Sequence, residues 1–106
     1  MIHIRIATKN SRCIQVVSKG HAEYAEEGQD IICAAVSVLM VNTANSIETL
    51  TEDGFTCEED DGYVAIAIEE ESSEGAHLLM ESLRLGLESI RETYGDAYLD
   101  IVTKEV

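Results

Sequence analysis

The fold of this chain is decided by the stretch DIICAAVSVLMVNTANSIETL, residues 30–50. Apolar side chains recur in it at helical spacing, and polar residues follow in step after Val41, so we interpret it as one long helix. Nearly every residue from Ile31 to Val41 is apolar or small, and we therefore expect the helix to be largely buried. The expected inward stripe consists of Ile32, Val36, Leu39, Met40, Thr43 and Ile47.

Strand-like segments in pairs flank this helix on both sides. Before it, residues 2–7 alternate apolar and other side chains, and a second strand is expected at 13–17 after a turn-like tetrapeptide. After it, strands are expected at 55–59 and 63–69, with a strong hairpin signal at Asp61-Gly62 between them. The pattern therefore predicts two β-hairpins around the central helix.

A second helix and a last strand complete the predicted order. The helix is expected to begin at a cap formed by Ser72 or Ser73 and to reach about Tyr94, where a glycine follows. A short strand is then expected at 98–102. The order ββαββαβ predicts one α+β domain over residues 1–106, with two helices packed on an antiparallel or mixed sheet.

The charge of the chain limits the classes of partner. The chain has seven Lys and Arg residues and 21 Asp and Glu residues, which gives a net charge of −14. Such a field repels phosphate backbones and anionic lipid, so we expect neither nucleic acid nor a membrane as a direct partner, whereas a basic polypeptide would be attracted. The apolar run at 31–41 is too short to span a bilayer, and the N-terminus lacks a signal-peptide pattern. We therefore expect a soluble, cytoplasmic protein.

Three cysteines and three histidines are the candidate ligands and nucleophiles. An odd cysteine count without close spacing argues against a disulfide framework and against a zinc site, and we expect no metal and no cofactor. Cys13 and Cys57 alternate with their neighbours in strands and are expected to be core or edge thiols. His3 and His77 are expected to be surface groups.

Cys33 lies where a helix start can affect its chemistry. We interpret Asp30 as the residue that caps the helix, which puts Cys33 in its first turn. The positive end of the helix dipole favours a thiolate there, while the charge of the cap opposes it, so the direction of the net pKa shift stays open. A nearby imidazolium would favour the thiolate.

The irregular stretch 18–29 offers that imidazole at His21. We interpret the stretch as a loop, and Gly20 and Gly28 allow it to bend back on itself. Cys33 and His21 together would suffice for acyl transfer, with the thiolate attacking a carbonyl and the imidazole protonating the leaving amine. On these residues alone the alternatives remain a core cysteine, a solvated histidine or a metal site.

Residues 20–37 read GHAEYAEEGQDIICAAVS, which resembles the signature of the ribosomal-processing cysteine protease family called Prp. The pattern is Gly-His-Ala followed by Gly-x-Asp-Ile-x-Cys-Ala-Ala-Val-Ser, and the resemblance extends over essentially the whole chain. It implies that Cys33 is the nucleophile and His21 the catalytic base. It also makes Asp30 and Ser37 motif residues that support the site or bind substrate.

The family resemblance also implies a substrate and an assembly. Prp proteases remove a short N-terminal extension from a bacterial large-subunit ribosomal protein, act as homodimers, and carry a glycine-bounded loop that is mobile without substrate. Whether Asp30 caps the helix or contacts His21 is left open. Ser37 either contacts substrate or bonds back to a helix carbonyl. Two roles are open for the acidic side chains of the loop, Glu23, Glu26 and Glu27. They either attract a basic substrate or simply keep the loop hydrated.

Two other functions are weighed against the endopeptidase. The chain could be a non-catalytic acidic partner of a basic ribosomal protein, which would bind without turnover and ignore thiol alkylation. It could also be a redox or metal sensor, which would form an internal disulfide on oxidation or co-purify with zinc.

Overall fold

The computed structural model describes residues 1–20 and 29–106, with the side chains of the first helix described from Ile31 onward. Its elements follow one another in the order ββαββαβ, which confirms the predicted order. They are β1 (Ile2–Lys9), β2 (Arg12–Lys19), α1 (Gln29–Leu50), β3 (Phe55–Asp60), β4 (Tyr63–Ile68), α2 (Glu74–Tyr94) and β5 (Leu99–Glu105).

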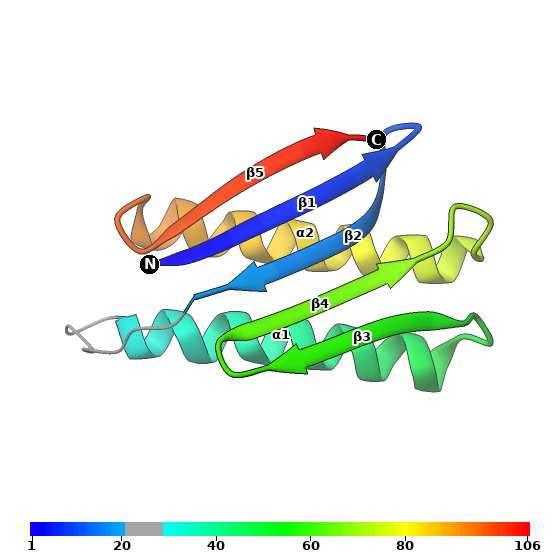
Figure 1. Cartoon of the computed structure of the whole chain (residues 1–106), viewed down its shortest axis with the longest axis horizontal. Helices are drawn as coiled ribbons and strands as arrows, with labels where there is room; N and C mark the ends of the chain where they lie inside the picture. The colour runs from blue at the N-terminus through cyan, green and yellow to red at the C-terminus, as the bar shows by residue number, and fades with distance from the viewer. Residues whose placement is uncertain (21–28) are drawn as a thin grey trace.

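The five strands form one mixed sheet in the spatial order β3-β4-β2-β1-β5 (Figure 1). The pairs β1–β2, β2–β4 and β3–β4 are antiparallel, whereas β5 runs parallel to β1. Parallel neighbours need a long crossover, and α2 lies in the connection that returns the chain from β4 to β5. The prediction of an α+β domain with an antiparallel or mixed sheet is confirmed.

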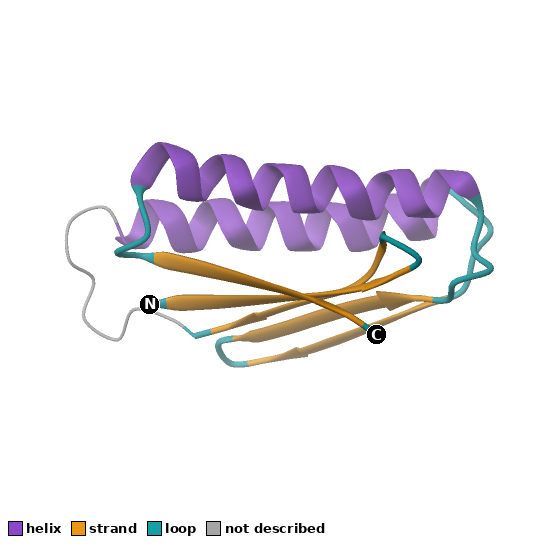
Figure 2. Ribbon diagram, turned by 90° about the horizontal axis from the view of Figure 1, so that it is seen from above, coloured by secondary structure: helices purple, strands orange, loops and turns teal. Residues whose placement is uncertain are grey.

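Both helices lie side by side on one face of the sheet and leave its other face uncovered (Figure 2). The core fills the space between the two layers, because alternate strand residues and one stripe of each helix point into it. The largest fully buried side chains are aliphatic: Ile4, Ile32, Met40, Ile47, Ile66, Met80, Leu83, Leu87 and Leu99.

Helix α1 is less buried than its composition predicts. Its expected inward stripe is buried except for Leu39, which is half-buried, but Ile31, Val38 and Val41 are exposed at 60%, 66% and 43%. A helix lying on a single sheet face covers only one side of itself, so the expectation of a largely buried helix is wrong. Among the described helices the segment Ile31–Leu50 alone meets a length-and-hydropathy criterion for a membrane span, a criterion that core helices also meet.

Several element ends lie one to three residues from their expected positions. Strand β2 continues through Ser18 to Lys19, because Ser18 lies in the ladder between Ile4 of β1 and Val64 of β4. Helix α1 begins at Gln29. Strand β5 extends to Glu105 through its parallel ladder with β1. In both strands the backbone pairing overrides the polar side chains that suggested an end.

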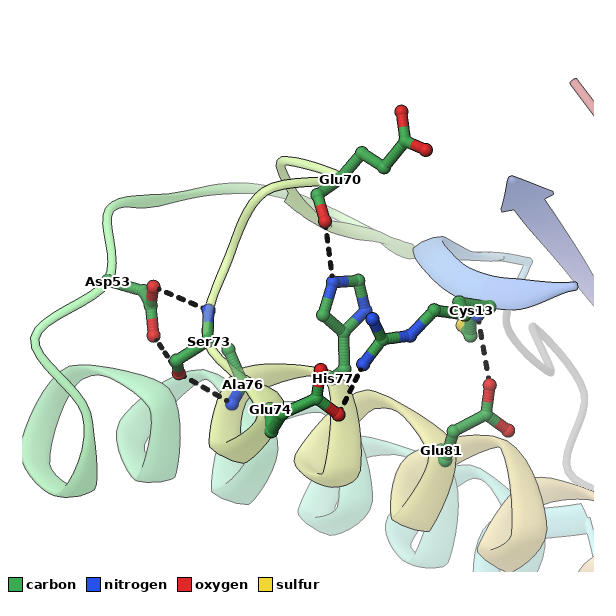
Figure 3. Close-up of polar contacts among 9 residues, drawn as sticks. Cys13, Asp53, Glu70, Ser73, Glu74, Ala76, His77 and Glu81 are labelled. Carbon is green, nitrogen blue, oxygen red and sulfur yellow. Dashed lines mark hydrogen bonds and ion pairs between the residues drawn. The ribbon is translucent and has the colours of Figure 1, made fainter. Parts of the chain in front are cut away.

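Several hydrogen bonds hold the start of α2 in place (Figure 3). The side chain of Ser73 accepts a hydrogen bond from the backbone N–H of Ala76, so Ser73 is the cap of this helix. The carboxylate of Asp53 in turn accepts hydrogen bonds from the backbone N–H of Ser73, at 2.9 Å, and from its hydroxyl. These two bonds hold the pKa of Asp53 below its usual range.

His77 is buried, which corrects the expectation of a surface group. It is 2% exposed on α2, its Nε2 donates to the carbonyl of Glu70 at 2.9 Å, and its Nδ1 is enclosed without a partner among the described residues (Figure 3). The turn between β4 and α2 folds over the ring, a tertiary contact that helix periodicity does not show. His3 does lie at the surface, beside Asp100.

Candidate active site

Cys33 is the fifth residue of α1 and lies at the border of its buried face. Ile32 and Val36, one turn apart, are 1% and 3% exposed and anchor this part of the helix on the sheet. The next line of side chains around the helix carries Cys33, which is half-buried, and Ser37, which is exposed. The helix therefore presents a thiol and a hydroxyl one turn apart beside the core.

A groove of about 240 Å³ opens in front of this thiol. Cys33, Val36 and Ser37 of α1 form one wall, and the start of β4, including Val64, contributes to the other. Ser18 of β2 also lines it. The groove is therefore a candidate binding site for a short segment of peptide beside Cys33.

Gly20 fixes the end of β2 at the same groove. Its N–H donates to the carbonyl of Gly62 in the β3–β4 turn at 2.8 Å, and its φ of +115° is one that other residues rarely adopt. A Cβ on Gly20 would lie 2.4 Å from the carbonyl oxygen of Met1. The chain therefore needs glycine at the last position before His21.

Three of the predicted site residues are not placed by the structure. His21 and Gly28 lie outside the described residues, and the side chain of Asp30 does as well. The backbone of Asp30 is the second residue of α1. The interpretation of Asp30 as the cap is thereby corrected, because the helix is already formed one residue before it.

Ser37 is exposed and lines the same groove as Cys33. The hydroxyls of Thr43 and Ser89 within the helices, and of Thr51 just after α1, donate to carbonyls four residues earlier at 2.7–2.9 Å. Within the described part of the chain Ser37 makes no such bond, although it lines the same groove as Cys33. Of the two roles left open by the sequence, this arrangement favours contact with substrate.

The other two thiols lie in environments that disfavour the thiolate. Burial, and secondarily the charge of Glu81, raise the pKa of Cys13 to about 11. Burial and the neighbouring Glu59 raise the pKa of Cys57, which is exposed on the edge strand β3. The expectation of core or edge thiols is confirmed, and neither residue lines the groove of Cys33.

A larger hollow of about 480 Å³ lies at the opposite end of the molecule. Its lining includes Asp53, Phe55 and Glu71, which follow the C-terminal end of α1 or precede α2. At 1.5 Å per helical residue, that end is roughly 25–30 Å from Cys33. The size of a hollow therefore does not locate the candidate chemistry in this protein. No group of three or more metal-ligating side chains gathers within residues 1–20 and 29–106.

Ser18 is a site residue that the sequence did not reveal. The sequence pattern predicts Ser18 to lie in the irregular stretch 18–29, where the strand pattern fails and glycines and glutamates follow. The sequence does contain one signal for its position. Ser18 lies two residues after Val16, and side chains two apart in a strand lie on the same face of the sheet. The structure confirms this placement, with both residues buried.

The comparisons with known proteins agree on one family. Residues 1–99 match the family described as "Cysteine protease Prp". A ribosomal processing cysteine protease Prp of Bacillus subtilis (strain 168) is 34% identical over 83 residues, covering 73% of this chain and 74% of that protein. The protein of the same name from Staphylococcus aureus (strain Mu50 / ATCC 700699) is 28% identical over 99 residues, covering 91% and 93%.

Solved structures show the same fold. The crystal structure of an essential ribosomal processing protease Prp from S. aureus in complex with a substrate peptide superposes with a TM-score of 0.89 at 26% identity, covering 98% of this chain and 100% of that one. The same S. aureus protease with a covalently linked product peptide gives a TM-score of 0.86 at 27% identity, covering 98% and 100%.

Proposed function

The chain belongs to the Prp family of cysteine proteases, and we propose that it removes a short N-terminal extension from a bacterial large-subunit ribosomal protein. The observation that carries this proposal is the half-buried thiol of Cys33 at the start of α1, facing a groove large enough for part of a peptide. The S. aureus relatives bound to a substrate peptide and to a covalently linked product peptide support a peptide as the ligand.

Cys33 acts as the nucleophile and His21 as the base in this proposal. The thiolate attacks the scissile carbonyl, the carbon–nitrogen bond breaks, and the imidazolium gives its proton to the leaving amine. Water then hydrolyses the thioester and restores the thiol. Support comes from Gly20, which lines the groove of Cys33 and directly precedes His21 in the chain.

The supporting residues have distinct proposed roles. Ser37, one helical turn from Cys33 and free of a back-bond among the described residues, contacts the substrate peptide. Asp30, in the first turn of α1, orients His21. Gly28 allows the bend of the chain into α1. The sequence motif supports the last two assignments, and the groove supports the first.

The substrate is a basic polypeptide in this proposal. The net charge of −14 attracts such a partner and steers its approach. Ribosomal proteins are synthesised and assembled in the cytoplasm, and we propose the cytoplasm as the location of the protease. Its three free thiols are compatible with a reducing compartment.

The test is a cleavage assay with the ribosomal protein that bears its extension. The wild-type protein should produce one discrete cut, and Cys33→Ala should lower kcat/KM by a factor on the order of 10⁶, the loss that removal of a catalytic nucleophile causes. His21→Ala should also lose cleavage. Cys57→Ala is the matched control, since this thiol lies on the edge strand away from the groove and should keep full activity.

Two results would contradict the proposal. Cleavage that survives Cys33→Ala would exclude Cys33 as the nucleophile. Binding of the precursor without any cleavage would favour the acidic, non-catalytic binding partner. Thermal unfolding of each variant separates loss of chemistry from loss of the fold.

We also propose that the protease acts as a homodimer through the outer faces of its helices. Ile31 and Val38, seven residues apart on α1, are 60% and 66% exposed, and Leu78 and Leu85, seven apart on α2, are 70% and 67% exposed. A spacing of seven puts each pair on one side of its helix. Since α1 and α2 lie side by side, the two pairs supply apolar surface that a second copy could cover (Figure 2). Sedimentation analysis measures the oligomeric state.

A further inference from the structure

Ser18 is a polar residue in a position that the fold otherwise fills with apolar side chains. It pairs with Ile4 of β1 and Val64 of β4, and it lies two residues beyond Val16 on the face of the sheet that the helices cover. Val16 and Ile4 are fully buried, and Ser18 is 8% exposed. A hydroxyl is thereby placed at the edge of an aliphatic core.

The hydroxyl of Ser18 has no hydrogen-bond partner among residues 1–20 and 29–106. Buried polar groups nearly always have partners, so an unpaired one requires an explanation. In the described chain the only fully enclosed side-chain nitrogen or oxygen without a partner is Nδ1 of His77. Ser18 contributes no such enclosed atom, and the space that this residue lines is the groove of Cys33.

The surroundings of Ser18 suggest what it could bind. Ile2, Val36 and Val64 give the groove apolar walls, and Cys33 lies on the same groove. A substrate side chain that enters beside the scissile bond would meet these walls first and the hydroxyl of Ser18 at the β2 side. An apolar stem with a polar end would fill such a pocket and satisfy the hydroxyl.

We propose that Ser18 is a specificity-determining residue of this protease. Its hydroxyl forms a hydrogen bond with a polar group, an amide or a hydroxyl, at the end of a substrate side chain held between Ile2, Val36 and Val64. The inference rests on the proposed peptidase function and adds the class of side chain that the groove selects. A hydrogen bond in a largely buried site discriminates strongly, because the analogue that lacks the group leaves the partner unpaired.

The test uses two variants of nearly the same shape. Ser18→Thr keeps the hydroxyl, whereas Ser18→Val replaces it with a methyl group. Each is assayed on peptides spanning the cleavage site of the ribosomal precursor, in which one position at a time carries Asn or Leu, or Tyr or Phe. The measured quantity is the ratio of kcat/KM for the polar peptide to that for its apolar counterpart.

The expected result is a change in selectivity at one substrate position. There the wild type and Ser18→Thr should both favour the polar peptide, and Ser18→Val should reduce the ratio by about tenfold. Ser89→Val is the matched control, because the hydroxyl of Ser89 bonds to the carbonyl of Leu85 on the exposed side of α2 and should leave every ratio unchanged.

The outcomes separate this inference from the proposed function. If the wild type cleaves the peptides but all ratios are the same in Ser18→Thr and Ser18→Val, Ser18 does not read the substrate, while the peptidase function stands. An equal loss of activity on all peptides in Ser18→Val would also overturn the inference, since it indicates a structural role. If the wild type cleaves none of the peptides and not the whole precursor, both proposals fail.

Discussion

Helices α1 and α2 each follow a β-hairpin, yet the side chains near their starts differ in what they contact. At α2, Ser73 caps the helix, Asp53 binds Ser73, and His77 is enclosed under the preceding turn (Figure 3). At α1, Cys33 and Ser37 instead line an open groove. The comparison teaches that one hairpin–helix unit stabilises the domain while its counterpart keeps polar groups available for a ligand.

The difference follows from where each polar group finds its partner. The serine and aspartate near α2 satisfy one another within the fold, which rigidifies that end. The hydroxyls of Ser18 and Ser37 have no partner within the described residues, and both residues line the groove. A buried polar group without a partner, as at Ser18, costs stability, and a ligand that forms a hydrogen bond with it recovers that cost.

The largest expected difference between the two ends is in thiol reactivity. Cys13 packs beside α2, where its backbone N–H donates to Glu81 at 2.9 Å, and its pKa is raised to about 11. At pH 8 only about one Cys13 in a thousand is therefore a thiolate, the form that reacts with iodoacetamide. We expect Cys33, which lines the groove, to be labelled more than about 10²-fold faster than this buried thiol, as measured by peptide mapping in a mass spectrometer.

Unfolding provides the control for this labelling experiment. In denaturant both thiols should react at similar rates, since the burial that protects Cys13 is lost. Equal labelling of Cys13 and Cys33 in the native protein would contradict the comparison, because it would mean that the end at α2 opens as readily as the groove.

The next effect concerns the backbone beside the groove. Gly20→Ala forces a Cβ to within 2.4 Å of the carbonyl oxygen of Met1 and strains a residue at φ +115°, so the chain must shift just before His21. Displacements of about 1 Å in an active site can cost about 10²-fold in rate, and we expect a loss of that order in kcat/KM. Gly54→Ala is the matched control at the other end.

The control should behave differently because of its surroundings. A Cβ on Gly54 meets no atom within 4 Å and its φ is not in the left-handed region, so its replacement should leave activity unchanged. A Gly20→Ala variant that unfolds at a lower temperature but keeps its kcat/KM would show that Gly20 serves only the fold.

The sequence predicted the elements of this fold because they rest on local patterns. The period-two alternation of residues 2–7 and the helical spacing of 30–50 each indicate that one face of the element is buried. Asp61-Gly62 indicates a hairpin turn regardless of how the rest of the sheet is arranged. The exposed outer face of α1 and the buried His77 were missed. Both depend on which layer covers which side, a tertiary property that no local pattern contains.

The site was predictable in part for a similar reason. The motif around Cys33 gave the candidate nucleophile and Ser37 by sequence alone. The groove itself is made by β2, β4 and α1 together. The alternation from Val16 can indicate the face of β2 on which Ser18 lies, but that this face borders Cys33 follows only from the tertiary pairing with Ile4 and Val64. Motif residues are thus easier to predict than the walls of the groove that they line.

The smallest effect is expected at the cap of α2. Ser73→Ala removes the acceptor for the N–H of Ala76 and a donor to Asp53, and we expect the free energy of unfolding to fall by about 1 kcal/mol while kcat/KM stays unchanged. Urea unfolding at pH 7 measures the first quantity. Ser72→Ala, one residue away and outside the cap, should change it by less than about 0.5 kcal/mol.

The pH dependence of the Ser73→Ala effect tests its cause. The hydroxyl of Ser73, which the variant lacks, helps to lower the pKa of Asp53 in the folded state. Its contribution is fully present above the ordinary carboxyl pKa of about 4 and is lost as the pH falls through the lowered value. The difference in stability between wild type and Ser73→Ala should therefore shrink as the solution is acidified below about pH 4. A difference that stays constant would mean that the helix cap, and not the charge of Asp53, accounts for the whole effect.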